Sequence, residues 1–311
     1  MPSIDAPPGG TEPDEAARAS VATFNSVDPR GACGLTSDAI TMASVGVHPL
    51  AIAAGAYVGD TSGLIEHIPL DDEAVRSQAR AVFEDVSIQV IKVGFVGSAE
   101  NISAIAEIAS DYEELPLIAY MPDLSWWEES RIESYHDAFR ELLLPQTTIL
   151  VGNHRTLCRW LLPEWEHSRG PGPRDIARAA SDWGVAHVVV TGINGPGQFI
   201  ENTLASPESV LETLKFERIE ASFSGAGDTL SAALAALIAT GLDLVSATRE
   251  SLEFLDGCLA SGFSPGMGKA IPDRMFWAQP AEAEGSDAFP SLHSGRHPGD
   301  KSNAPLPDFP A

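Results

Sequence analysis

The stretch FSGAGDTLSAALAAL, residues 223–237, decides the fold. Its second half consists almost entirely of alanine and leucine and predicts a buried helix, which Gly241 is placed to end. Its first half puts Gly225, Ala226 and Gly227 at the start of that helix. There, free backbone N–H groups and the positive end of the helix dipole can face an anion, because no large side chain stands in the way. The stretch therefore predicts an anion hole at a helix start.

Asp228 follows in the first turn of this predicted helix, and two interpretations are open. In one, Asp228 only caps the helix, since a carboxylate near the positive end of the dipole adds about 0.3–1 kcal/mol of stability. In the other, it is a general base that takes the proton of a substrate hydroxyl as that hydroxyl attacks a phosphoryl group. The sequence contains no G-x-x-x-x-G-K-[ST] loop, so a P-loop route to ATP is excluded.

Length, charge and cysteine content narrow the class of protein. The chain has 311 residues, 44% of them hydrophobic, and 44 acidic against 19 basic side chains give a formal charge of −25. Such an excess of carboxylates repels phosphate backbones and predicts no nucleic-acid partner. Neither a signal-peptide pattern nor a run of roughly 18 apolar residues is present, so we expect a cytoplasmic protein without a membrane partner. The isolated Cys33, Cys158 and Cys258 argue against a disulfide framework or a zinc site.

Between residues 21 and 279, short apolar runs alternate with helical patterns. The expected strands cover 21–27, 49–57, 90–95, 116–120, 148–151 and 187–191, with a hairpin partner at 199–204, and the expected helices cover 35–45, 71–85, 102–110, 131–144 and 175–183. This alternation predicts one α/β domain with a mostly parallel sheet, helices on both faces, and ligands near the carboxyl ends of the strands. Residues 1–20 and 280–311 are expected to be disordered tails, because they offer little to bury.

Several further stretches occur in the order and spacing of one known family. Residues 28–34 read DPRGACG, close to the family's Asp-Pro-Ser-Gly-Gly-Ala-Gly opening, and after them come SVGV at 44–47, FEDV at 83–86, KVGF at 92–95, LLP at 143–145 and SPGMG at 264–268. Together with residues 223–237, they make the body resemble the vitamin-kinase branch of the ribokinase superfamily, and within it the hydroxymethylpyrimidine/phosphomethylpyrimidine kinases of thiamine biosynthesis. The resemblance implies a ribokinase-like three-layer fold with a central mostly parallel sheet flanked by helices. It also implies ATP and Mg²⁺ as cofactors, a small-molecule alcohol of pyrimidine type as substrate, and a homodimer.

The same resemblance assigns roles to individual positions. They are Asp228 as general base; Gly225, Ala226 and Gly227 as the anion hole; Asp28, Gly59 and Phe95 as substrate contacts; and Asn153, Thr191, Gly192 and Thr229 as ATP contacts. The resemblance assigns no residue of this sequence to a metal ion.

The sequence also departs from the family at polar positions. Asp228 stands where hydroxymethylpyrimidine kinases commonly have Cys and pyridoxal kinases have Asp. Gly59 stands at a substrate-recognising glutamine, whose loss leaves a polar group unpaired at a cost of about 1–3 kcal/mol. Tyr120 replaces an aspartate, Thr156 the glutamate of an Asn-x-x-Glu motif, and Thr191 a phosphate-side lysine. These changes leave a hydroxymethylpyrimidine-type kinase, a pyridoxal-type kinase and a non-catalytic ligand-binding paralogue as alternatives.

Other polar and aromatic residues near the motifs have an ordinary interpretation beside a functional one. Arg155 is a replacement cation or a surface ion-pair partner, and Lys269 approaches a phosphate or is a solvated loop lysine. Lys92 starts an expected strand and is predicted to snorkel at its end. The pair Trp126-Trp127 stacks on a ring-shaped ligand, packs on the surface or forms a dimer contact.

Overall fold

The structure, a computed structural model, describes residues 18–278. The tails expected at 1–20 and 280–311 therefore lie outside the described residues, apart from residues 18–20. Ser20 is buried and opens the first strand, so the folded body begins at least one residue before the expected boundary.

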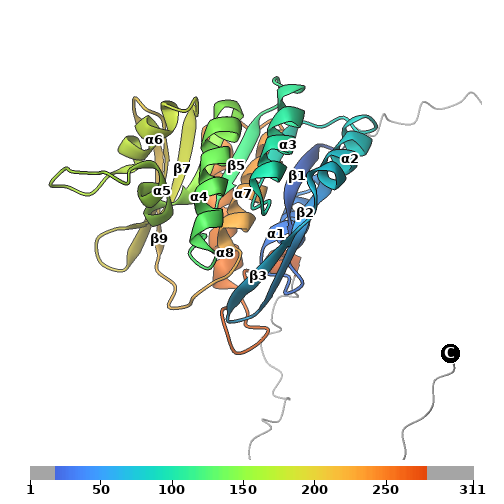
Figure 1. Ribbon diagram of the computed structural model, residues 1–311. Coiled ribbons are helices and arrows are strands. Elements are labelled where there is room, and N and C mark those ends of the chain that lie inside the picture. Colours follow the sequence, from blue (N-terminus) through green and yellow to red (C-terminus); the bar gives the residue numbers. More distant parts are fainter. Residues whose placement is uncertain (1–17, 279–311) are drawn as a thin grey trace, which may run out of the picture. The chain divides into compact units, whose positions relative to one another are not determined.

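A nine-stranded sheet forms the centre of the described part of the chain (Figure 1). Its strands are β1 (Ser20–Val27), β2 (His48–Asp60), β3 (Gly63–Pro69), β4 (Val90–Val93), β5 (Leu117–Met121), β6 (Ile149–Asn153), β7 (His187–Asn194), β8 (Phe199–Ala205) and β9 (Val210–Glu217). They lie in the order β3-β2-β1-β4-β5-β6-β7-β8-β9. The pairs β2–β3, β7–β8 and β8–β9 are antiparallel, and the other five pairs are parallel. In the sheet, β2 lies on one side of β1 and β4 on the other. The carboxyl ends of β1 and β4 thus flank a switch point, the place where such sheets bind ligands.

Helices cover both faces of the sheet and complete three layers (Figure 1). They are α1 (Gly34–Ser44), α2 (Asp72–Phe83), α3 (Ala99–Ser110), α4 (Glu129–Ala138), α5 (His154–Leu161), α6 (Pro173–Ser181), α7 (Ala226–Ala239) and α8 (Leu244–Ala260). On the face of α1, α7 and α8, Met42, Leu234 and Leu252 belong to one buried apolar cluster. On the face of α2 to α6, Val75 and Ile105 belong to another. The three-layer α/β architecture expected from the sequence is confirmed.

α7 is buried because its residues are small, as the sequence predicts. Residues 230–236 are each at most 1% exposed, and the helix packs against α1, α8 and the central strands β4 and β5. Gly241, with a φ of +94°, follows the end of the helix, where a left-handed residue commonly stops it. This central position fixes where the first turn of α7 meets the sheet.

The structure contains four elements that the sequence patterns do not predict, namely β3, β9, α5 and α8. In addition, the helix expected over 131–144 is divided. α4 passes into a π-helical turn (Phe139–Leu143) and then a 3-10 turn (Leu144–Gln146). Pro145 lies in that last turn and cannot donate the backbone hydrogen bond that would continue an α-helix.

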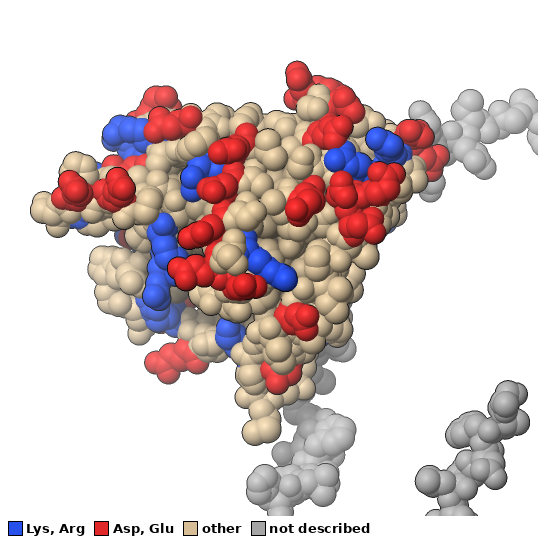
Figure 2. Space-filling view, viewed as in Figure 1, with Lys and Arg blue, Asp and Glu red and all other residues tan. Residues whose placement is uncertain are grey.

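The surface carries the acidic excess of the sequence. Figure 2 shows carboxylates spread over one face, with fewer basic side chains between them. Within residues 18–278, no helix combines the length and the apolar character needed to cross a bilayer. Cys33 and Cys158 are half-buried, Cys258 is buried, and all three are free thiols.

Candidate active site

Two glycines allow other segments to approach the start of α7. Gly225, just before the helix, has a φ of +85°, and a Cβ there would lie 1.7 Å from the carbonyl oxygen of Ala32. A Cβ on Gly227 would lie 2.1 Å from the phenol oxygen of Tyr120. The helix start therefore lies between the turn that contains Ala32 and the end of β5. Any larger residue at either glycine would push these segments apart.

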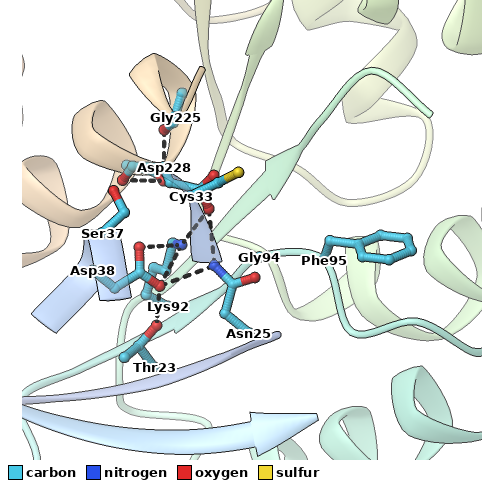
Figure 3. Close-up of polar contacts among 12 residues, drawn as sticks. Thr23, Asn25, Cys33, Ser37, Asp38, Lys92, Gly94, Phe95, Gly225 and Asp228 are labelled. Carbon is cyan, nitrogen blue, oxygen red and sulfur yellow. Dashed lines mark hydrogen bonds and ion pairs between the residues drawn. The ribbon is translucent and has the colours of Figure 1, made fainter. Parts of the chain in front are cut away.

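Asp228 lies in the first turn of α7 and is 7% exposed. Its Oδ1 accepts a hydrogen bond from Asn25 Nδ2 at 2.8 Å and lies 3.5 Å from Lys92 Nζ (Figure 3). Asn25 belongs to β1 and Lys92 to β4. The carboxylate thus lies over the switch point of the sheet and is not turned to bulk solvent.

Lys92 is fully buried, so the prediction that it snorkels at a strand end is wrong. Its ammonium donates to both carboxylate oxygens of Asp38 at 2.8 Å, and Asp38 also accepts from Thr23 Oγ1 at 2.7 Å and Asn25 Nδ2 at 3.0 Å. The pattern along β4 cannot reveal this partner, because Asp38 comes from α1. Burial holds the pKa of Asp38 above its ordinary value, although Lys92 acts in the opposite direction.

Asp28 is tied into its own turn. Its carboxylate accepts from Arg30 Nε and from the backbone N–H of Cys33, both at 2.8 Å, and from the N–H of Ala32 at 3.2 Å. Burial acts to raise the pKa of Asp28, but the hydrogen bonds from Arg30 and Cys33 outweigh it and leave the pKa below its ordinary value. These contacts show that Asp28 builds the turn against which Gly225 packs. A direct substrate contact of this residue stays a prediction.

Phe95 is buried in an aromatic cluster beside the switch point. Its ring stacks on Tyr57 with centroids 5.7 Å apart, and the rings of Trp126 and Trp127 lie at 5.6 and 5.0 Å. Figure 3 shows Phe95 directed away from the polar contacts around Asp228. Trp126 and Trp127 therefore belong to this cluster rather than to an isolated surface patch.

Tyr57, two residues before the expected Gly59, faces the site from β2. Its ring stacks on Phe95, and burial together with the charge of Asp228 raises the pKa of Tyr57 well above its ordinary value. A Cβ on Gly59 would instead lie 2.4 Å from the carbonyl oxygen of Gly63, across the β2–β3 hairpin. A substrate contact of Gly59 stays a prediction.

Ser26 and His67 form a polar contact beside the aromatic cluster. Ser26 Oγ donates to the carbonyl oxygen of Phe95 at 2.9 Å and lies 2.7 Å from His67 Nε2. With the hydroxyl proton used in this way, Nε2 is the ring nitrogen that donates to Ser26 Oγ. Burial lowers the pKa of His67 to about 4. His67 therefore remains uncharged at neutral pH.

A cavity of about 210 Å³ opens between the carboxyl ends of β6 and β7, the antiparallel strands β8 and β9, and α8. Three of the expected ATP contacts line it, namely Asn153, Thr191 and Gly192, together with Ala226 at the start of α7. Thr229, the fourth expected contact, is fully buried and lies outside this lining. The cavity therefore reaches the helix start from the side opposite to the aromatic cluster.

The cation beside the helix start is Arg274, which the sequence analysis does not single out. It is 4% exposed, and its Nε donates to Thr229 Oγ1 at 2.9 Å, while the two Nη groups donate to the carbonyl oxygens of Gly31 and Ala32. Nη2 lies 2.8 Å from the place of a Cβ on Gly225. None of the ion pairs formed within residues 18–278 involves Arg274. A buried guanidinium thus meets only neutral acceptors here.

The other candidate cations lie elsewhere. Arg155 is exposed at the start of α5, and its backbone N–H donates to Asn153 Oδ1, which caps the helix. The backbone N–H of Lys269 donates to Thr61 at the β2–β3 hairpin, and Lys269 lines a separate shallow surface hollow. Among the described residues, no group of three or more His, Cys, Asp and Glu side chains is placed to hold a metal ion.

Comparison with known proteins gives a consistent family. Residues 28–273 match the family model described as phosphomethylpyrimidine kinase. Curated relatives include the hydroxymethylpyrimidine/phosphomethylpyrimidine kinase of Streptomyces coelicolor, 25% identical over 80% of this chain and 91% of that protein. The enzyme of the same description from Mycobacterium tuberculosis is 26% identical over 87% of this chain and 97% of its own length.

Solved structures share the fold. Bacillus subtilis pyridoxal kinase in complex with ADP superposes with a TM-score of 0.75 at 19% identity, covering 84% of this chain and 99% of that chain. Phosphomethylpyrimidine kinase from Clostridium difficile gives a TM-score of 0.63 at 20% identity, with coverages of 78% and 100%. At these identities the likeness concerns the fold.

Proposed function

The chain belongs to the phosphomethylpyrimidine kinase family, and we propose that it transfers a phosphoryl group from ATP to a pyrimidine vitamin precursor. Family membership makes the protein a phosphotransferase with an alcohol group as acceptor. The proposed acceptor is the hydroxymethyl group of hydroxymethylpyrimidine or of its phosphate, as in thiamine biosynthesis or salvage. The observation that supports the reaction here is the position of Asp228, an acid in the first turn of α7 above the switch point of the sheet.

Asp228 is the proposed general base. Its Oδ1 is engaged by Asn25 and Lys92, while Oδ2 accepts no hydrogen bond from the part of the chain that the structure describes. Oδ2 is therefore the oxygen that accepts the proton of the substrate hydroxyl as its oxygen attacks. A positioned general base typically contributes a factor of about 10²–10⁴ to the rate.

The start of α7 is the proposed anion hole. The first N–H groups of a helix have no acceptor within it, and Gly225, Ala226 and Gly227 themselves carry no long side chain that could cover them. They can donate to the oxygens of the group in transfer, where the helix dipole also favours negative charge. Arg274 adds a positive charge close to the same helix start.

The cavity beside Ala226 is the proposed nucleotide site. Its lining combines apolar side chains of β9 and α8, such as Phe216 and Leu252, with the polar Asn153 and Thr191. This mixture suits a purine and ribose, with the phosphates extending toward α7. When bound, ATP supplies the phosphoryl group. The described residues form no cage for Mg²⁺, which proteins commonly hold through one or two carboxylates plus the nucleotide phosphates, so no residue is assigned to it.

The aromatic cluster of Phe95, Tyr57 and the two tryptophans is the proposed contact for the flat ring of the substrate. A pyridoxal-type kinase is the second candidate, because pyridoxal also has a flat ring with a hydroxymethyl group and because Asp228 is the residue type of that branch. A homodimer and a cytoplasmic location belong to the proposal as family-based expectations.

The decisive experiment compares three acceptors at equal ATP and Mg²⁺ concentrations: hydroxymethylpyrimidine, its monophosphate and pyridoxal. ADP release and ³¹P NMR of the product are measured for the full chain and for Asp228→Asn. We expect turnover of the pyrimidines and a loss of about 10²–10⁴ in kcat for the variant. Asp71→Asn is the matched control, since Asp71 only caps α2 and asparagine caps a helix equally well.

Each outcome has a distinct meaning. Faster turnover of pyridoxal selects the second candidate. Calorimetric binding of an acceptor without ADP release would show a non-catalytic binding protein. Unchanged turnover in Asp228→Asn would remove Asp228 from the mechanism.

A further inference from the structure

Below Asp228 lies a charged network that the proposed reaction does not use. Lys92 and Asp38 have fully buried side chains, and the Asp228 side chain is 10% exposed. The network thus places two carboxylates and one ammonium side by side at the switch point (Figure 3). Replacing a buried ion pair by apolar groups is often neutral or stabilising, so stability alone is a weak reason for its presence.

The ammonium of Lys92 joins both carboxylates. It is 2.8 Å from each oxygen of Asp38 and 3.5 Å from Oδ1 of Asp228. Asp38 is itself fixed by Thr23 Oγ1 at 2.7 Å. Asp38 therefore fixes the Lys92 ammonium, and this ammonium in turn contacts the Asp228 carboxylate.

Asn25 makes the second connection, and its orientation is fixed. Its Nδ2 donates to Oδ1 of Asp228 and to Oδ2 of Asp38, so both amide protons are used. Its Oδ1 accepts from the N–H of Ser26 at 2.9 Å, which distinguishes the oxygen of the amide from its nitrogen. Gly94 makes room for this amide, because a Cβ there would lie 2.4 Å from Nδ2.

We propose that Lys92, held by Asp38, and Asn25 are the positioning residues for Asp228. Both act on Oδ1 and fix the rotation of the carboxylate, so that Oδ2 is the oxygen presented to the substrate hydroxyl. Lys92 thereby places a positive charge 3.5 Å from Oδ1 of Asp228. This inference rests on the proposed function, in which Asp228 is the base.

Four other titratable groups interact with the charge of Asp228, and all remain in place in the test. They are Cys33, Tyr57, Tyr120 and Arg274. Arg274 is the only cation among these four, and it is held by carbonyl and hydroxyl oxygens that the test does not change.

The test uses the double variant Asp38→Asn/Lys92→Met. A single Lys92→Met change would leave Asp38 as an unpaired buried charge and risk misfolding, whereas the double variant removes one charge of each sign. Lys215→Met is the matched control, because it removes a lysine whose Nζ forms a partly exposed ion pair with Glu201 Oε1 at 3.0 Å. Thermal unfolding of both variants, with and without ADP, checks that they fold and bind nucleotide.

The first readout is kinetic. We expect kcat of the double variant to fall about 100-fold, the usual effect of a misplaced catalytic group, while KM for ATP stays within about two-fold. The acid side of its pH–rate profile should move to higher pH, because the lost ammonium contacts Asp228 Oδ1 at 3.5 Å and outweighs the lost carboxylate of Asp38, which makes no direct contact with Asp228 among the described residues. Lys215→Met should match the wild type. An unchanged kcat and pH profile in a folded double variant would overturn the proposal.

The second readout does not depend on activity. In protein labelled with ¹³C at aspartate carboxyl groups, the resonance missing from Asp228→Asn belongs to Asp228. We expect this resonance to titrate at higher pH in the double variant than in the wild type, and equal titration would overturn the proposal. If the wild type transfers no phosphate to any acceptor, the proposed function fails, and this titration still decides whether the Asp38–Lys92 pair controls the Asp228 carboxyl.

Discussion

Asn25 and Asp228 lie 203 residues apart in the sequence and are joined by a hydrogen bond of 2.8 Å. The bond connects β1, the strand at the switch point, with α7, the helix whose start forms the proposed anion hole. The acid is thus oriented only when these two distant segments have packed together. The orientation of the proposed base therefore depends on the central packing of α7.

Gly94→Ala tests this relationship without changing any charge. The added methyl would lie 2.4 Å from Asn25 Nδ2, so the amide must move away from Asp228. We expect kcat to fall about ten- to 100-fold with KM for ATP unchanged, since Gly94 is far from the nucleotide cavity in the sheet order. Steady-state kinetics at saturating acceptor measure the effect. Gly170→Ala is the control, because a Cβ there meets no atom within 4 Å, and equal kinetics of the two variants would contradict the prediction.

The sequence was most informative where chemistry and local structure coincide. Residues 223–237 predict both the buried helix and the acid at its start, because small residues, glycines and Asp228 are adjacent in the chain. The Asp38–Lys92 pair could not be predicted in the same way. Its partners come from α1 and β4, and a lysine at the start of a strand has the same local pattern whether it is solvated or buried.

Arg274→Met tests the contribution of a buried cation to folding. Arg274 donates to Thr229 Oγ1 and to the carbonyl oxygens of Gly31 and Ala32, so it ties the end of the described chain to the first turn and to α7. Losing charged donors to buried acceptors typically costs about 1–3 kcal/mol. We expect urea unfolding to show a loss of that size. Arg249→Met, which breaks an exposed pair with Glu212, should have a much smaller effect, and equal losses would contradict the prediction.

Arg274 and Tyr57 show why the rest of the site escaped sequence analysis. Arg274 follows a loop whose only readable signal is SPGMG, so nothing local connects it with α7. Tyr57 lies two residues from Gly59, the substrate position that the resemblance assigns. A register shift in the β2–β3 hairpin separates the two residues, and such irregularities have no distinct pattern in a single sequence.

His67 predicts a pH dependence of stability. Burial lowers its pKa from 6.5 to about 4, so below pH 6.5 the unfolded chain takes up a proton that the folded chain refuses. The contribution of His67 to the free energy of unfolding is therefore complete above pH 6.5. It falls by at most about 3 kcal/mol as the pH drops to 4. In urea unfolding between pH 4 and 7.5, the free energy of unfolding of His67→Gln should therefore change less with pH than that of the wild type. Burial also lowers the pKa of His136 to about 4, but His136 is present in both proteins and cancels in the difference. If the free energy of unfolding changed with pH equally in both proteins, His67 would not be the cause of the pH dependence.

The close approach of Tyr120 to Gly227 at the start of α7 predicts that the effects of substitutions at these two positions are coupled. A methyl group on Gly227 would lie 2.1 Å from the Tyr120 hydroxyl, so Gly227→Ala must displace either the phenol or the helix start. We expect this change to lower kcat/KM for ATP about ten- to 100-fold, because the first N–H groups of α7 move away from the phosphates. Tyr120→Leu removes the hydroxyl with which the methyl collides. In the double variant it should recover most of the loss, a coupling of about 1–2 kcal/mol in the cycle. Additive losses in the four proteins would mean that the phenol does not limit the space at the helix start.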